Sequence, residues 1–179
     1  AESPDTVIKV GFPTDATAAQ VYAILNAQIQ KNKQEESNFD GVAKVFNYIP
    51  GLLLKFVVWL LNLLDYFGLI PKGLLAVSPF HGSIYITSMG SLGIPPIFHH
   101  LYDFGNVPLF CSFGAKKKRY ELQADGSVAE RKYIDYCFVT DERICDGFNY
   151  ASAFKLTKTF LRNPALLDTP PETVVEDIS

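Results

Sequence analysis

The chain has 179 residues, of which 48% are hydrophobic and 20% are charged, and its formal net charge is −3 at neutral pH. This length and hydrophobic fraction suffice for one domain with one sizeable core. Basic residues are not in excess, so the charge balance argues against a nucleic-acid partner. One basic cluster, residues 116–119, lies between two strand-like stretches and fits a solvated turn better than a phosphate contact.

The cysteine pattern bears on the compartment and on metal binding. The chain has three cysteines without C-x-x-C spacing, which predicts free thiols, a reducing compartment and therefore a cytoplasmic location. Neither cysteine nor histidine residues cluster at metal-ligand spacing, so no metal is expected. No basic stretch followed by an apolar run opens the sequence, so no signal peptide is expected.

The first part of the chain predicts a strand followed by a helix. Apolar residues alternate over residues 7–12, which is typical of a half-buried strand. Helical spacing of apolar residues follows over 13–30, and Thr14 or Asp15 is the predicted N-cap. Residues 31–40 are polar and predict a connection or a frayed helix end.

Residues 50–75 form the most apolar stretch and predict a helix over 51–67. Lys55, Asn62 and Asp65 interrupt the stretch and fall within one narrow arc of a helix. A membrane span needs about 20 predominantly apolar residues, so no span is predicted. We expect this helix to be buried on most of its circumference, against the core or another subunit. Binding to a membrane surface is the less favoured alternative.

From residue 80 onward the pattern changes to strands. Strands are predicted around 83–88, 107–113, 119–123 and 128–139, all in one sheet, with Asp125-Gly126 as a two-residue hairpin turn. A helix over 148–162 is expected to pack on this sheet, and residues 169–179 form a polar tail. The sequence therefore predicts a single α/β domain with a largely antiparallel or mixed sheet.

Three stretches occur in an order that resembles that of a known superfamily: "SIYITSMGSLGI", "VPLFCSFGA" and "DERICDGFNYASAFKLTKTFLRNPALL". From about residue 79 to residue 168 the chain resembles the C-terminal half of the chloramphenicol acetyltransferase-like fold. It is most similar there to the catalytic domains of 2-oxo acid dehydrogenase (lipoyl) acyltransferases. The resemblance implies a two-layer α/β sandwich, a mixed sheet with helices on one face, and a trimer. It also implies that the chain, one domain over 1–179, lacks the family's N-terminal segment.

The resemblance further implies acyl transfer between a thioester, of coenzyme A or a lipoyl group, and a thiol or hydroxyl acceptor. No covalently bound cofactor is implied. In the family's H-x-x-x-D-G motif the histidine is the general base, and a hydroxyl of another subunit stabilises the oxyanion. Asp146 and Gly147 match the motif, the aspartate in a structural role and the glycine at a tight turn, and Arg143 matches a common residue inside it. Thr87 and Ser88 match the hydroxyl region, and the sequence leaves open which of them faces the oxyanion.

Glu142 occupies the position of the motif histidine. The pKa of a histidine ordinarily lies near neutral pH and that of a glutamate well below it, so glutamate is the weaker base there. The alternative interpretation of Glu142 is a solvated side chain, or one paired with Arg143 or Lys132. Two functions therefore stay open: an acyltransferase with a substituted base, or an inactive homologue with a structural, assembly or acyl-carrier-binding role.

Other side chains could supply the chemistry that the motif lacks. His99 or His100 could act as base, with Asp103 to orient it, although a helix end or a subunit contact explains the pair as well. Cys145 is a candidate nucleophile, or else a small packed hydrophobe.

Overall fold

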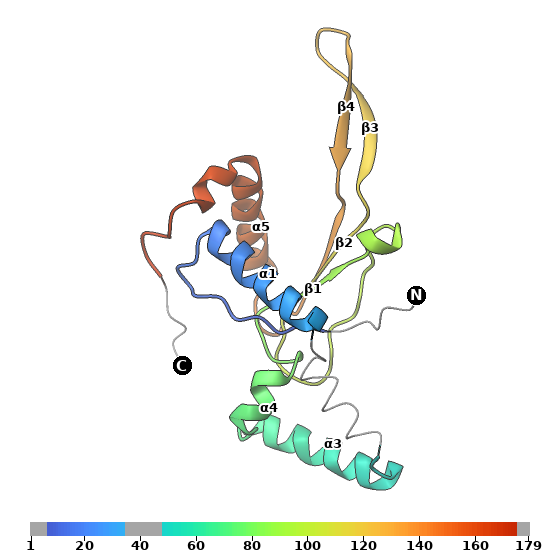
Figure 1. The fold of residues 1–179 in the computed structure, drawn as a ribbon, viewed down its shortest axis with the longest axis vertical. Helices are drawn as coiled ribbons and strands as arrows, with labels where there is room; N and C mark the ends of the chain where they lie inside the picture. Colours follow the sequence, from blue (N-terminus) through green and yellow to red (C-terminus); the bar gives the residue numbers. More distant parts are fainter. Residues whose placement is uncertain (1–6, 35–47, 175–179) are drawn as a thin grey trace. The chain divides into compact units, whose positions relative to one another are not determined.

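The structure, a computed structural model, describes residues 7–34 and 48–174. The elements are α1 (Ala18–Gln34), α3 (Gly51–Tyr66), α4 (Lys72–Val77), β1 (Tyr85–Ser88), η1 (Gly90–Leu92), β2 (Leu109–Phe113), β3 (Lys117–Leu122), β4 (Val128–Tyr133), β5 (Tyr136–Thr140), α5 (Gly147–Arg162) and η2 (Pro164–Leu167) (Figure 1). The predicted α/β class is confirmed.

The chain divides into two compact units. One is Phe80–Gly147, which holds β1 to β5, and the other is formed by the residues before and after it. The helices α1, α3 and α4, with nearly all of α5, belong to this other unit. A single domain over 1–179, and a helix of residues 148–162 packed on the sheet, stay predictions.

The helix α1 confirms the predicted helix but not its predicted cap. The backbone N–H of Thr17 donates to Gln20 Oε1 at 2.8 Å, and the N–H of Gln20 donates to Thr17 Oγ1 at 3.4 Å. This reciprocal pair is a capping box, and it makes Thr17 the residue that starts the helix. The predicted caps Thr14 and Asp15 are wrong, because the helix begins only at Ala18, directly after Thr17. The helix continues to Gln34, and residues 35–40 of the predicted connection lie outside the described residues.

The strand predicted at residues 7–12 is wrong, because the described structure has no strand there. A side chain of this segment makes a hydrogen bond instead: Lys9 Nζ donates to the carbonyl oxygen of Leu75 at 2.5 Å, and burial lowers the pKa of Lys9. Alternation of apolar residues shows only that a segment has two faces. A strand also needs a partner for its backbone, which a local pattern does not supply.

The helix α3 confirms the helix predicted over 51–67 and ends where Gly68 was expected to stop it. Gly68 has a φ of 66°, and Leu69 N–H donates to the carbonyl oxygen of Leu64 at 2.7 Å, which is typical of a Schellman C-cap. Within the described chain the core leaves much of α3 uncovered, since Leu52 is 85% and Trp59 57% exposed. Burial of this helix against another subunit stays a prediction. No helix in residues 7–34 and 48–174 has the length and apolarity needed to cross a membrane.

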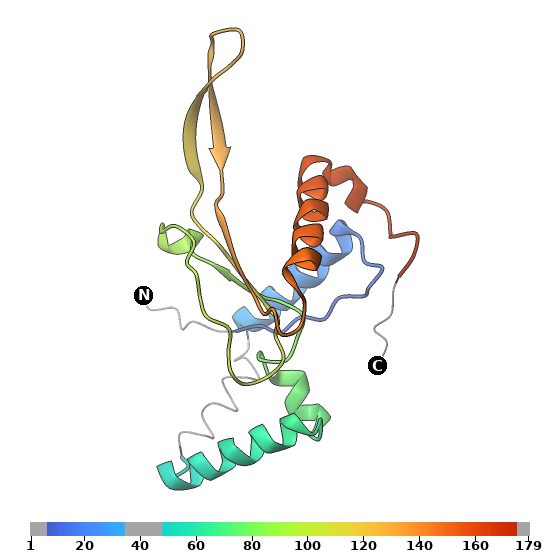
Figure 2. The ribbon, with the colours of Figure 1, turned by 180° about the vertical axis from the view of Figure 1, so that it is seen from behind.

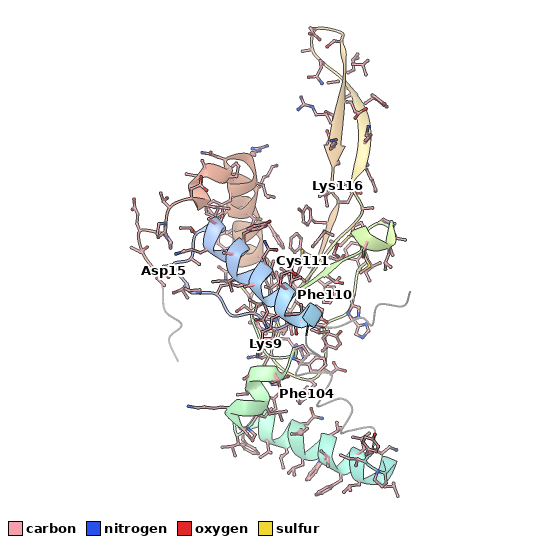
Figure 3. The ribbon with its side chains drawn as sticks, viewed as in Figure 1. Lys9, Asp15, Phe104, Phe110, Cys111 and Lys116 are labelled. Atoms are coloured by element: carbon pink, nitrogen blue, oxygen red, sulfur yellow. The ribbon has the colours of Figure 1, made fainter. Side chains whose placement is uncertain are left out.

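The strands β1, β2 and β5 form a mixed sheet with β2 in the middle. Strand β1 is parallel to β2, with Tyr85 opposite Phe110, and β5 is antiparallel to β2. The central strand carries the most buried side chains of this unit: Phe110 is 3%, Cys111 6% and Ser112 0% exposed. Figure 3 labels Phe110 and Cys111 in this position. The core of the sheet therefore lies along β2, and the mixed sheet of the prediction is confirmed.

The strands β3 and β4 form a separate two-stranded ribbon, so the prediction of one sheet with a continuous strand over 128–139 is wrong. Three residues, 114–116, separate β2 from β3, whereas only two, 134–135, separate β4 from β5. The extra residue shifts the register as in a β-bulge and interrupts both ladders. In both views the ribbon extends beyond the sheet (Figures 1 and 2).

Gly114 stands at this interruption. Its N–H donates to the carbonyl oxygen of Asp135 at 3.0 Å, and a Cβ placed there would lie 2.6 Å from Cδ of Pro96. The residue-96 segment thus packs on the strand at the point where the ladder changes register.

The Asp125-Gly126 turn is present, but the loop has three residues rather than two. Gln123 N–H donates to the carbonyl oxygen of Ser127 at 2.8 Å, which leaves residues 124–126 as the loop. Gly126 has a φ of 84°, as expected for the last residue of such a loop. The hairpin is confirmed and its two-residue turn is corrected.

Candidate functional site

The "DERICDG" segment follows β5 as a turn that Asp141 organises. The backbone N–H of Asp141 donates to the carbonyl oxygen of Pro108, and its own carbonyl oxygen accepts from Ile144 and Cys145. Its carboxylate accepts the N–H of Arg143 at 3.0 Å. The turn is therefore fixed to the start of β2 and closed by its own first residue.

The guanidinium of Arg143 also binds Asp141, in a forked arrangement. Nε lies 2.9 Å from Oδ1, and the second terminal nitrogen lies 2.7 Å from Oδ2. These bonds hold the pKa of Asp141 below its ordinary value and raise that of Arg143, with a smaller contribution to the latter from Asp103. The interpretation that Glu142 pairs with Arg143 is therefore wrong, because the arginine pairs with Asp141.

Glu142 itself is exposed, and its Oε1 lies 3.6 Å from the position that a Cβ on Gly147 would occupy. Asp146 is exposed and directly precedes Gly147, the first residue of α5. The φ of Gly147 is not in the left-handed region, so its backbone conformation does not require glycine. Cys145 is a half-buried free thiol within the turn.

The two candidate hydroxyls lie on opposite faces of β1. Thr87 is half-buried on the face of Tyr85, whereas Ser88 is exposed. Ser88 Oγ accepts the N–H of Gly90 at 3.3 Å, in the Gly-Ser turn that follows the strand. A hydroxyl that accepts this bond keeps its own proton to donate. Ser88 is therefore the better placed of the two to donate a hydrogen bond to a bound group.

Within one chain, Glu142 and Ser88 lie at opposite ends of the three-stranded sheet. Ser88 is opposite Phe113, and Asp141, next to Glu142, is bonded to Pro108 at the other end of β2. At the usual rise per residue this part of β2 spans about 17 Å. One copy of the chain therefore does not bring the motif glutamate and the exposed serine together.

The histidine pair lies on the Tyr85 face of the same sheet. The ring of His99 stacks on Phe110 at 4.7 Å between centroids, and Phe110 stacks on Tyr85 at 5.2 Å. Nδ1 of His99 lies 2.5 Å from the carbonyl oxygen of His100, an acceptor only, so Nδ1 carries the proton. This leaves Nε2 of His99 as its basic nitrogen. His100 is exposed and stacks on His99 at 4.8 Å.

Aromatic rings enclose this face of the sheet. Tyr102 contacts Tyr85 and Phe80, and Phe104 contacts both Phe80 and the buried ring of His81. Burial, and secondarily Tyr102, raises the pKa of Tyr85. The surroundings of His99 are therefore a packed aromatic cluster.

The described residues include no ready-made metal centre. Across 7–34 and 48–174, no three His, Cys, Asp or Glu side chains are grouped so that they could hold an ion. Cys111, Cys137 and Cys145 are free cysteines, and burial raises the pKa of Cys111.

The comparisons with known proteins add no family name. No protein-family model and no curated protein matches the chain.

Sequence reasoning missed Asp141, which organises the motif turn. The signal was present, since an aspartate directly after a strand often closes a turn by accepting the backbone N–H two residues further on. It also missed the role of Ser112, whose hydroxyl donates to the carbonyl oxygen of Ile97 at 2.6 Å and accepts its N–H at 3.0 Å. That contact joins residues far apart in sequence, so no local sequence pattern predicts it.

Proposed function

We propose that the chain is a chloramphenicol acetyltransferase-like protein that transfers an acyl group between a coenzyme A or lipoyl thioester and a thiol or hydroxyl acceptor. The site is shared by two copies, in a trimer by resemblance to the family. Glu142 of one copy is the base, and Ser88 of another donates to the oxyanion.

The observation that carries this proposal is the placement of the two residues at opposite ends of one sheet. Both side chains are exposed in the single chain, so each is accessible to another copy. A site that uses both must be built between copies, as the resemblance to the family implies. Because oligomers of one chain repeat the same contact, each copy would contribute both halves to different sites.

The reaction would proceed in two steps. Glu142 takes the proton of the acceptor, whose sulfur or oxygen attacks the thioester carbonyl, and Ser88 donates a hydrogen bond to the resulting oxyanion. The carbon–sulfur bond of the donor then breaks, and Glu142 returns the proton to the leaving thiolate. A solvated carboxylate is a weaker base than an imidazole at neutral pH, so we expect slow turnover.

The second candidate is an inactive homologue with an assembly or acyl-carrier-binding role. It is favoured by the exposure of Glu142, whose carboxylate is in contact with solvent in the single chain. The two candidates differ in whether any acyl thioester is turned over.

Thiol release from acetyl-coenzyme A distinguishes them. We expect Glu142→Gln to reduce turnover by about 10²–10⁴-fold and Ser88→Ala by about 10²–10³-fold. Glu130→Gln and Ser127→Ala change an exposed carboxylate and an exposed hydroxyl of the β3–β4 hairpin, and both should leave turnover unchanged.

A mixing experiment tests the shared site. Glu142→Gln and Ser88→Ala chains, refolded together in equal amounts, should form an intact Glu142–Ser88 pair at about a quarter of the sites and regain that share of activity. Recovery no higher than that of the separate variants contradicts a site between copies. Glu142→His should raise turnover above the wild type. No turnover by either protein with coenzyme A or lipoyl thioesters supports the inactive homologue.

A further inference from the structure

Asp141 binds the motif turn through both its side chain and its backbone. Its carboxylate accepts three N–H groups of Arg143, from the backbone, Nε and a terminal nitrogen, at 2.7–3.1 Å. Its backbone binds Pro108 on one side and Ile144 and Cys145 on the other. Glu142 lies in sequence between the two residues of this forked ion pair.

The exposure of the two partners indicates what the pair does. The side chain of Asp141 is 12% exposed, whereas that of Arg143 is 80% exposed. Both carboxylate oxygens of Asp141 are occupied by the arginine, so this residue does not present an oxygen to a bound molecule. Any effect of Asp141 on a reaction would therefore be indirect, through the turn that it shares with Arg143 and Glu142.

We propose that Asp141 is a positioning residue, which fixes the direction of the Glu142 carboxylate through its forked pair with Arg143. The inference rests on the proposed function, because it names the support of that same base. A planar guanidinium bound at two points resists rotation, whereas a single contact does not. Loss of the fork lets Glu142 sample orientations from which it cannot reach the acceptor proton.

A double-mutant cycle on the full-length chain tests the proposal. Asn at position 141 can still accept the backbone N–H of Arg143, so Asp141→Asn keeps the turn and removes the charged fork. We expect kcat to fall about 10–100-fold, the size of effect that a small misplacement produces, with KM little changed. In the Glu142→Gln background the same substitution should have no further effect, because the residue through which Asp141 acts has lost its function.

Asp125→Asn is the matched control. Asp125 Oδ1 accepts the N–H of Ser127 at 2.9 Å, the same two-residue contact as in the motif turn, but in the β3–β4 loop. It should leave kcat unchanged. Arg143→Lys removes the fork while it keeps Asp141 and the positive charge, and it should reproduce the loss of kcat. This second variant covers the case in which Asp141→Asn fails to fold.

The outcomes separate this inference from the function on which it rests. If the wild type is active and Asp141→Asn or Arg143→Lys retains full kcat, the positioning role is overturned and the acyl transfer stands. Equal losses from Asp141→Asn with and without Glu142→Gln indicate a merely structural residue and also overturn it. If the wild type has no turnover, both proposals fail together.

Discussion

The β3–β4 ribbon directly continues two strands of the three-stranded sheet, since β3 follows β2 and β4 precedes β5 in the chain. The sheet and the ribbon are nevertheless stabilised differently. The sheet buries Phe110, Cys111 and Ser112, whereas no residue of β3 or β4 is buried. The ribbon instead pairs charges across its strands, as Lys118 does with Glu130 at 2.9 Å. Figure 3 labels Lys116, which lies at the junction of the two parts. Replacing a buried side chain therefore lowers the free energy of unfolding strongly, whereas removing an exposed ion pair changes it little.

The largest expected effect comes from emptying the centre of the sheet. Phe110→Ala removes a buried ring that stacks on Tyr85 and His99, and we expect it to lower the free energy of unfolding by about 3–5 kcal/mol. Tyr120→Ala is the counterpart on the ribbon, where the ring is 72% exposed, and should cost about 0.5 kcal/mol. Urea unfolding measures both. Similar losses for the two variants would contradict the contrast between the two parts.

Two glycines with positive φ sharpen the comparison at the level of the backbone. Gly105, before β2, has a φ of 88°, and a Cβ there would lie 2.0 Å from the carbonyl oxygen of Phe80. We expect Gly105→Ala to lower the free energy of unfolding by about 2–3 kcal/mol, through strain and displacement of residue 80. Gly126→Ala at the ribbon loop has nothing within 4 Å and should cost only the strain of its φ, about 1 kcal/mol. If Gly126→Ala proves the more costly in urea unfolding, the close approach to Phe80 does not restrict Gly105.

The smallest effect concerns the ion pair at the junction. Lys117 Nζ lies 2.5 Å from Oδ2 of Asp135, and this contact lowers the pKa of Asp135 from its ordinary value. A carboxyl group with a lowered folded-state pKa stabilises the fold above its unfolded pKa, and this stability is lost as pH falls through the folded value. Lys117→Met should therefore raise the pKa of Asp135 in an NMR titration and weaken the acid dependence of unfolding.

Asp125 is the internal reference for this titration. Its pKa is lowered by hydrogen bonds from Ser127, which Lys117→Met does not alter. An unchanged pKa for Asp135, or equal shifts for both carboxyl groups, would show that Lys117 is not the cause.

The sequence predicted those features of the candidate site that depend on local contacts, but not those that depend on contacts between distant segments. The motif turn, the exposed position of Glu142 and the Gly-Ser turn after Ser88 lie within short segments, and the sequence predicted their elements. The choice of Ser88 over Thr87 as the exposed hydroxyl required the face of β1 that is covered. The separation of Glu142 from Ser88 required the register of three strands, because strands pair across the chain and a shift of one residue exchanges their faces.

By itself the sequence determined the helices α1, α3 and α5, the hairpin and the mixed α/β class. Helical spacing, Gly68 and the Asp-Gly pair act over a few residues and need no partner elsewhere in the chain. Only the tertiary structure decided that residues 7–12 form no strand and that β4 and β5 are separate strands. It also decided that Asp141, rather than Glu142, binds Arg143. Backbone pairing and the contacts of a side chain depend on which segments meet, and that depends on the packing of the whole unit.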